Sequence, residues 1–187
     1  MTPFFEALTF LEEKLGLKVN VTKSKVDRPN GIKYLGFGFY YDVFSHQFKA
    51  KPHQVSVKKL KDKLKRLTSR SWGVSTSYRV FKLKQLIIGW VNYFKIGQMK
   101  GICKELDEHI RFRLRMCIWK QWKKVRTRYK NLQKLGIPKG KAWEWANTRK
   151  GYARVARSYI LHRTITNERL KKFGLVSLLD HYQLVHI

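Results

Sequence analysis

Two groups of acidic residues are the first candidates for chemistry in this sequence. Glu12 and Glu13 are adjacent in a segment with helical periodicity, and Glu105, Asp107 and Glu108 lie together in a second such segment. Metal-dependent nucleotidyl transfer or phosphodiester hydrolysis needs clustered carboxylates, because they must hold two divalent ions against the reacting phosphate. Adjacent side chains on a helix diverge, and lysines lie close to both groups. We therefore interpret both groups as solvated acidic faces and predict no metal site.

Other catalytic patterns are missing from the sequence. It contains no phosphate-binding P-loop, no GxGxxG, no HExxH and no legible Ser/His/Asp order. The six histidines have no ligand-like spacing. Cys103 and Cys117 lie in a predicted helix without a CxxC pattern, so we expect two buried thiols rather than a disulfide or a zinc site. The residues by themselves predict a chain that is not an enzyme and needs no cofactor.

The charge of the chain predicts a polyanionic partner. Its 187 residues include 41 Lys and Arg against 12 Asp and Glu, a net charge of +29, and 43% of them are hydrophobic, which is enough for a packed core. The excess lies almost wholly in one part: residues 1–50 hold 7 basic and 5 acidic side chains, whereas residues 51–187 hold 34 and 7. No apolar run approaches the roughly 20 residues of a membrane span, and the N-terminus lacks the basic start of a signal peptide. We therefore expect a cytoplasmic protein that binds nucleic acid and no membrane.

Basic and aromatic side chains are interleaved in two segments, 111–130 and 143–159. This pattern supplies phosphate contacts and stacking surfaces together, and stacking favours the unpaired bases of RNA over duplex DNA. The predicted phosphate contacts are Arg111, Arg115, Lys123, Arg126, Arg128 and Lys130. Trp119 and Trp122 are the candidate stacking residues, whereas we expect Trp90, Tyr93 and Phe94 in the core.

Hydrophobic periodicity predicts an α+β fold, with a short N-terminal helix and a small antiparallel sheet followed by a mainly α-helical bundle. The first helix should end at Gly16, and strands are expected at 17–21, 24–26, 32–41 and 47–51. After Pro52 the apolar period becomes helical, with Ser56 and Ser75 as expected N-caps. The predicted helices cover residues 56–70, 75–95, 101–135, 139–148, 151–157, 166–173 and 175–183.

Three segments, in this order, resemble a group II intron reverse transcriptase and its maturase region: FFEALTFLEEKLGLKVNVTKSKV, IKYLGFGFY and IIGWVNYF. The resemblance covers nearly the whole chain and implies three parts. Residues 1–52 would be a remnant of the palm with a primer-grip-like hairpin, and residues 53–135 the helical thumb or maturase domain. Residues 136–187 would be a distal basic helical segment.

The resemblance also assigns residues. Asn20 and Lys23 would match an Asn-x-x-Lys motif whose lysine approaches the incoming nucleotide, and Tyr34 and Gly36 would belong to the primer grip. The residues that would match the maturase signature, which holds intron RNA or a template–primer duplex, are Gly89, Trp90, Asn92, Tyr93 and Phe94. The family's catalytic Tyr/Phe-x-Asp-Asp turn is missing, and the sequence contains no Asp-Asp dipeptide. Lys23, the one catalytic residue that the family implies here, would therefore act only with a partner that holds the metal pair.

These observations leave three hypotheses for the function. The first is an RNA-binding maturase-like fragment that binds group II intron RNA and assists its folding and splicing, while the RNA performs the transesterification. The second is a non-autonomous piece of a split or truncated RNA-directed DNA polymerase, which is active only with its missing N-terminal part. The third is a generic nucleic-acid-coating protein, for which the family resemblance would be irrelevant.

Overall fold

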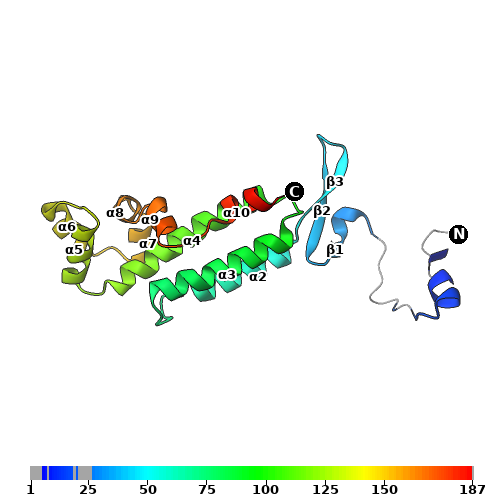
Figure 1. Cartoon of the computed structure of the whole chain (residues 1–187), viewed down its shortest axis with the longest axis horizontal. Helices are drawn as coiled ribbons and strands as arrows, with labels where there is room; N and C mark the ends of the chain where they lie inside the picture. Colours follow the sequence, from blue (N-terminus) through cyan, green and yellow to red (C-terminus); the bar gives the residue numbers. More distant parts are fainter. Residues whose placement is uncertain (1–5, 8, 19, 21–26, 187) are drawn as a thin grey trace.

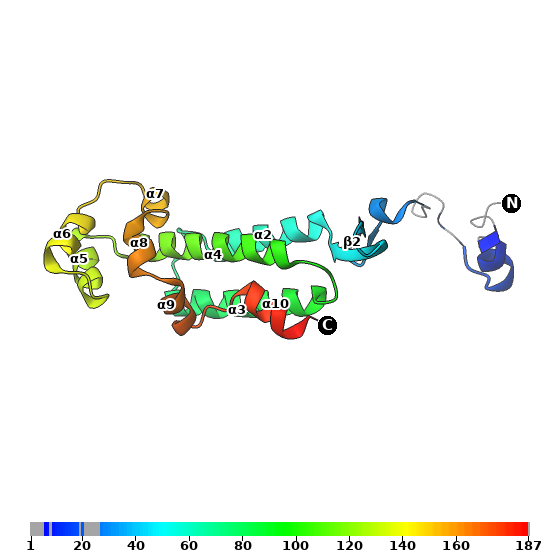
Figure 2. The same cartoon turned by 90° about the horizontal axis from the view of Figure 1, so that it is seen from above.

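The structure is a computed structural model and describes residues 6–7, 9–18, 20 and 27–186. A small sheet lies at one end of a set of long helices that run in a common direction (Figure 1). The same arrangement is visible from above, where α2, α3, α4 and α10 lie lengthwise beside one another (Figure 2). The predicted α+β class, with a sheet near the N-terminus followed by a helical bundle, is confirmed.

The sheet contains three antiparallel strands in the order β1-β2-β3, namely β1 (Lys33–Tyr34), β2 (Phe37–Asp42) and β3 (Gln47–Pro52). The third strand is close to its prediction, but the single strand predicted over 32–41 is wrong. The chain reverses at Leu35 and Gly36, whose φ angles of 46° and 84° are both left-handed. Two successive left-handed residues form the tight hairpin turn that matches the twist of the flanking strands.

Gly36 allows the sheet to touch the helices. A side chain at this position would place its Cβ 3.1 Å from Ser56 Oγ and 3.3 Å from Phe94 Cζ. Ser56 Oγ instead donates a hydrogen bond of 2.8 Å to the carbonyl oxygen of Gly36. Ser56 is therefore an anchor for the turn and not the N-cap we predicted for α2 (Gln54–Leu67), since the side chain of His53 accepts the bond from Val55 N.

The described residues before the sheet only partly match their predictions. Residues 6 and 7 are helical, and η1 (Phe10–Lys14) adds one irregular helical turn, followed later by the short η2 (Pro29–Gly31). Residues 17, 18 and 20 are not in a strand, so the strand predicted over 17–21 is wrong there. The strand predicted over 24–26 lies outside the described residues.

The next long helices are α3 (Thr76–Phe94) and α4 (Lys100–Gln121). Ser75 caps α3 as predicted, because its hydroxyl accepts a bond of 3.2 Å from Tyr78 N. The continuous helix predicted over 101–135 is wrong. It breaks after Gln121, and a separate helix, α5 (Val125–Lys134), follows. At this break the carbonyl of Trp122 has no partner within α4. It accepts a hydrogen bond of 3.0 Å from Arg128 Nε, which stabilises the end of α4.

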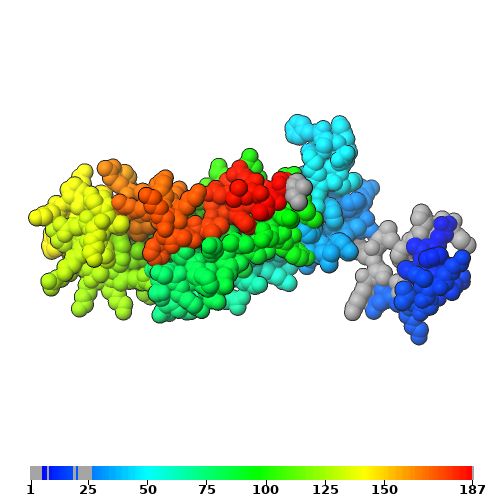
Figure 3. All heavy atoms as spheres, in the orientation of Figure 1, coloured from blue at the N-terminus to red at the C-terminus, as the bar shows by residue number. Residues whose placement is uncertain are grey.

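Five short helices complete the chain: α6 (Lys139–Ala146), α7 (Tyr152–Ala156), α8 (Tyr159–Thr164), α9 (Asn167–Lys172) and α10 (Leu178–Val185). Of these, α8 was not predicted. Helices α7 and α10 pack against α4, and α10 also packs against α3. The space-filling view shows α5 and α6 together at the end of the body far from the sheet (Figure 3). Leu64, Leu83, Leu106 and Leu178 contribute to one core from four helices, and burial of each such side chain stabilises the fold by about 1.5–3 kcal/mol.

Both cysteines lie in this core, as predicted. Burial, with a smaller contribution from Asp107, raises the pKa of the Cys103 thiol to about 12. Burial also raises the pKa of Cys117, whose Sγ contacts the carbonyl oxygen of Thr68. Both thiols therefore stay protonated and act as small apolar side chains.

The buried carboxylate of Asp107 joins α4 to the start of α10. It accepts bonds from Ser177 Oγ at 2.6 Å, Leu178 N at 2.8 Å and Leu179 N at 3.0 Å. Farther along α10, the hydroxyl of Tyr182 donates a bond of 3.0 Å to the carbonyl of Gly97. A residue in the middle of the chain thus satisfies the free N–H groups at the start of its last helix.

We expect Asp107→Asn to lower the free energy of unfolding by about 1–3 kcal/mol, because an amide offers one acceptor oxygen where the carboxylate offers two. Glu108→Gln, at an exposed neighbouring position on α4, is the matched control and should leave stability unchanged. Urea denaturation followed by circular dichroism measures both. Equal stability of the two variants would contradict this account of α10.

Candidate nucleic-acid interface

Several arginines of this basic chain point inward, toward the carbonyl ends of helices. At the end of α2, the guanidinium of Arg79 donates to the carbonyls of Leu67, Ser69 and Trp72. Arg113 reaches the same helix end from α4 and donates to Thr68 Oγ1 at 2.6 Å. The last carbonyls of a helix lack partners within it and carry partial negative charge, so a cation satisfies both needs.

Other helix ends are held in the same way. Arg169 donates to the carbonyls of Thr164 and Leu135, at 2.6 and 3.0 Å, and so joins the ends of α8 and α5. The Arg128 guanidinium donates to the Trp122 carbonyl and lies 4.7 Å from the ring centre of Trp119. These arginines stabilise the fold, and several of their donors are engaged by backbone oxygens before a polyanion approaches.

Arg115 and Trp119, which we predicted as RNA contacts, are buried, at 4% and 1% exposure, and this burial counts against both predictions. The guanidinium of Arg115 donates to the carbonyl of Ile165 at 2.8 Å and to Asn167 Oδ1 at 2.9 Å. Burial, followed by the nearby Arg111, lowers its pKa, and two of its three guanidinium nitrogens are engaged inside the protein. The ring of Trp119 offers no open face to a base. Both residues lie on α4, which is covered by α7 and α10.

The remaining predicted contacts gather around α5. Lys123, Arg126 and Lys130 are exposed, whereas Arg128 between them is half-buried and turned toward α4 and α6. Trp122 is half-buried and lies 5.8 Å from Trp119, ring centre to ring centre. The structure thus brings three predicted cations onto one exposed segment and removes the fourth from it.

Arg111 lies elsewhere, at a polar cavity of about 570 Å³ between α4 and the helices that follow α6. His109 and His162 line the same cavity. Burial, followed by Arg113 and Lys61, lowers the pKa of His109, and burial followed by Arg115 lowers that of His162. Both imidazoles are therefore neutral near pH 7 and add no positive charge to this surface.

The positions that the resemblance assigns to the palm are only partly described. Lys23 lies outside the described residues, and Asn20 is exposed. Tyr34 is exposed in β1, and Gly36 occupies the turn that contacts α2 and α3.

The residues expected in the core near this turn differ from one another. Phe94 is buried and Trp90 half-buried, but Tyr93 is 54% exposed and donates a bond of 2.8 Å to the carbonyl of Leu35. The core prediction for Tyr93 is therefore wrong, since its ring lies beside the sheet at the surface.

Sequence reasoning missed the densest row of exposed cations, which lies on α2. These side chains are Lys58, Lys59, Lys61, Lys63, Lys65 and Arg66. Lys61 pairs with Glu105 at 2.6 Å. The others form no ion pair within the part of the chain that the structure describes. The signal was present in VKKLKDKLKRL, where leucines at helical spacing leave the other positions after Val57 to lysine and arginine, with Asp62 as the one acid.

Within the described ranges, no group of three or more Asp, Glu, His or Cys side chains could hold a metal ion. None of the described helices combines the length and the apolar character needed to cross a membrane. What the described surface offers is a set of exposed cations on α2 and around α5, on a frame fixed by inward arginines.

Comparison with known proteins identifies the helical part of the chain. No curated protein matches the sequence. Residues 57–136, which span α2 to α5, match the family described as group II intron, maturase-specific domain. This is a maturase domain and not a polymerase catalytic domain. Residues 57–136 thus match the group II intron maturase-specific domain, and the resemblance seen in the sequence is confirmed for this part of the chain.

Proposed function

We propose that the chain binds group II intron RNA and assists its folding and splicing. The observation that carries this proposal is the coincidence of a maturase-specific domain at 57–136 with the exposed cations of α2 and α5. RNA helices repel one another through their phosphates, and this repulsion opposes the compact form in which an intron splices. Cations fixed on rigid helices reduce that repulsion, so the protein favours the compact form while the RNA breaks and joins its own bonds.

The affinity for intron RNA should depend strongly on salt. We expect the cations of α2 and α5 to neutralise about six to ten phosphates, and each single-strand phosphate contributes ~0.7 to the salt dependence. A plot of the logarithm of the binding constant against the logarithm of salt concentration should therefore have a slope of roughly −4 to −7. Filter binding at several salt concentrations measures the slope. A slope near zero would contradict phosphate neutralisation as the source of affinity.

Charge reversal around α5 should weaken RNA binding without unfolding the protein. The triple variant Lys123→Glu, Arg126→Glu and Lys130→Glu changes exposed side chains only, and it should reduce the steepness of the salt slope by about 2, or ~0.7 per lost phosphate. Arg128 is left unchanged because it holds the ends of α4 and α6.

Arg115→Gln is the contrasting variant. It should lower the melting temperature, because it removes buried hydrogen bonds worth about 1–3 kcal/mol. An unchanged affinity in the triple variant would move the RNA site away from α5. Equal affinity of the wild type for intron RNA and for random RNA or duplex DNA would instead favour a generic coating protein.

A second candidate function rests on the sheet. Apolar side chains are exposed on it and on its β2–β3 turn, with Phe44 at 98% and Val43 at 69%. Tyr41 and Phe48 lie nearby, 5.3 Å apart between ring centres. Contiguous exposed apolar side chains are typical of a surface that a partner covers. In this hypothesis the partner is the part of a reverse transcriptase that carries the catalytic aspartates.

Reconstitution tests this second function. The chain alone should not extend a primer, and a mixture with a separately expressed fingers–palm polypeptide should. Phe44→Ser with Phe48→Ser should then abolish extension in the mixture while leaving RNA binding by the chain unchanged. No extension in the mixture would contradict this second function.

A further inference from the structure

A groove lies between α2 and α3, where we predicted no phosphate contact, although the resemblance assigned Gly36, Trp90 and Tyr93 of its lining to the primer grip and the maturase signature. It consists of two adjoining hollows that share Lys63 and Leu86. The larger hollow, of about 610 Å³, lies at the α2–α3 loop, and the smaller, of about 260 Å³, lies at the β1–β2 turn. The groove therefore follows α2 for most of its length.

One wall of the groove is cationic. Lys59, Lys63 and Arg66 are exposed at intervals of four and three residues, so they project from the same face of α2, with steps of about 6 and 4.5 Å along its axis. None of the three pairs with a carboxylate in the described part of the chain. Among the described residues, no Asp or Glu lines either hollow.

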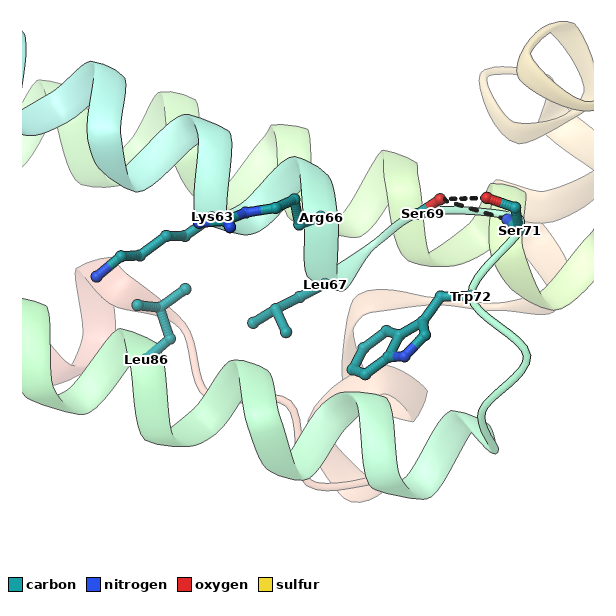
Figure 4. A pocket seen from close by; sticks show the side chains of 7 residues that line it. All are labelled: Lys63, Arg66, Leu67, Ser69, Ser71, Trp72 and Leu86. Carbon is teal, nitrogen blue, oxygen red and sulfur yellow. Dashed lines mark hydrogen bonds between the residues drawn. The ribbon is translucent and has the colours of Figure 1, made fainter.

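The floor is apolar and aromatic. In the larger hollow, Leu67, Leu86 and Trp72 lie between the two helices, with Lys63 and Arg66 on the α2 side (Figure 4). In the smaller hollow, Trp90 and Tyr93 of α3 continue the floor toward the sheet. A row of cations thus runs beside a row of apolar side chains along one groove.

Both ends of the groove are fixed before any ligand arrives. The Arg79 guanidinium bonds to the carbonyl of Trp72 and lies 5.1 Å from the centre of its ring, which holds the loop in place. At the other end, Tyr93 bonds to the carbonyl of Leu35, and Ser56 to that of Gly36. A preformed site loses less conformational entropy when it binds.

We propose that this groove binds an unpaired stretch of RNA, with phosphates along Lys59, Lys63 and Arg66 and bases over the apolar floor. This inference rests on the proposed function and specifies which part of an RNA the α2–α3 face takes. A duplex would offer phosphates to the lysines but would keep its bases stacked inside, leaving the floor uncovered. Cationic grooves with aromatic floors are typical of proteins that bind single strands.

The test compares two pairs of lysines on the same helix. Lys59→Ala with Lys63→Ala removes two groove cations, whereas Lys58→Ala with Lys65→Ala removes two exposed cations that do not line either hollow. The probe is a fluorescent single-stranded RNA of about ten nucleotides, alone or annealed to its complement. Anisotropy at several salt concentrations gives the affinity and the salt slope of the full-length chain.

For the single strand, we expect the groove pair to reduce the steepness of the salt slope by about 1.4, at ~0.7 for each lost phosphate contact, and the control pair to change it little. Trp72→Ala should weaken single-strand binding at least about fivefold, and Trp72→Phe should largely preserve it because the ring remains. Affinity for the annealed duplex should respond equally to both lysine pairs.

Equal effects of the two lysine pairs on the single strand, or unchanged affinity in Trp72→Ala, would overturn the groove assignment. So would wild-type protein that binds intron RNA but not the single-stranded probe, and in that case the proposed function would stand. Wild-type protein that fails to bind intron RNA would instead overturn the proposed function itself. Thermal melting of each variant separates lost binding from lost folding.

Discussion

The fold depends on guanidinium groups that satisfy the carbonyl ends of its helices. A chain of many short helices has many such ends, and each leaves carbonyls without partners inside the helix. With 41 basic and only 12 acidic side chains, most cations cannot pair with a carboxylate. Arg79, Arg113, Arg128 and Arg169 bond to backbone oxygens instead. The planar, multiply donating guanidinium suits this task, whereas the single ammonium of lysine suits exposure to solvent.

The difference between inward arginines and exposed lysines explains which parts of the fold and the site could be predicted from the sequence. The N-cap of α3 and the approximate bounds of α3 and β3 could be predicted from local patterns, because the residues of each element contain the signals that define it. The break at Trp122 and the burial of Arg115 did not follow, because both depend on α6 to α9, which approach α4 from far along the chain. Arg115 and Arg126 have the same side chain in similarly basic segments, yet one is buried and the other is exposed. Local periodicity places a residue on a face of its helix but does not reveal how many faces other elements cover.

The surface left by this arrangement has two kinds of cation, with different surroundings. Those around α5 stand on a short exposed segment, where a phosphate backbone can approach from several directions. Those of Lys59, Lys63 and Arg66 stand beside leucine and tryptophan, so a ligand there meets charge and apolar surface together. Electrostatic attraction alone does not distinguish one RNA from another. A site that also contacts bases can favour particular regions of a folded RNA, which is what assistance with folding requires.

The contact between Asp107 and residues 177–179 has a consequence for biosynthesis. About seventy residues separate the carboxylate from its donors, so α4 emerges from the ribosome long before the N–H groups that its acid needs. Until residues 177–186 are synthesised, the core lacks the side chains of Leu178 and Tyr182, which are buried in the finished fold. The packing of α10 against α3 and α4 is therefore completed late in translation. A pause or early stop before residue 177 would leave the apolar surface that α10 covers exposed to chaperones and proteases.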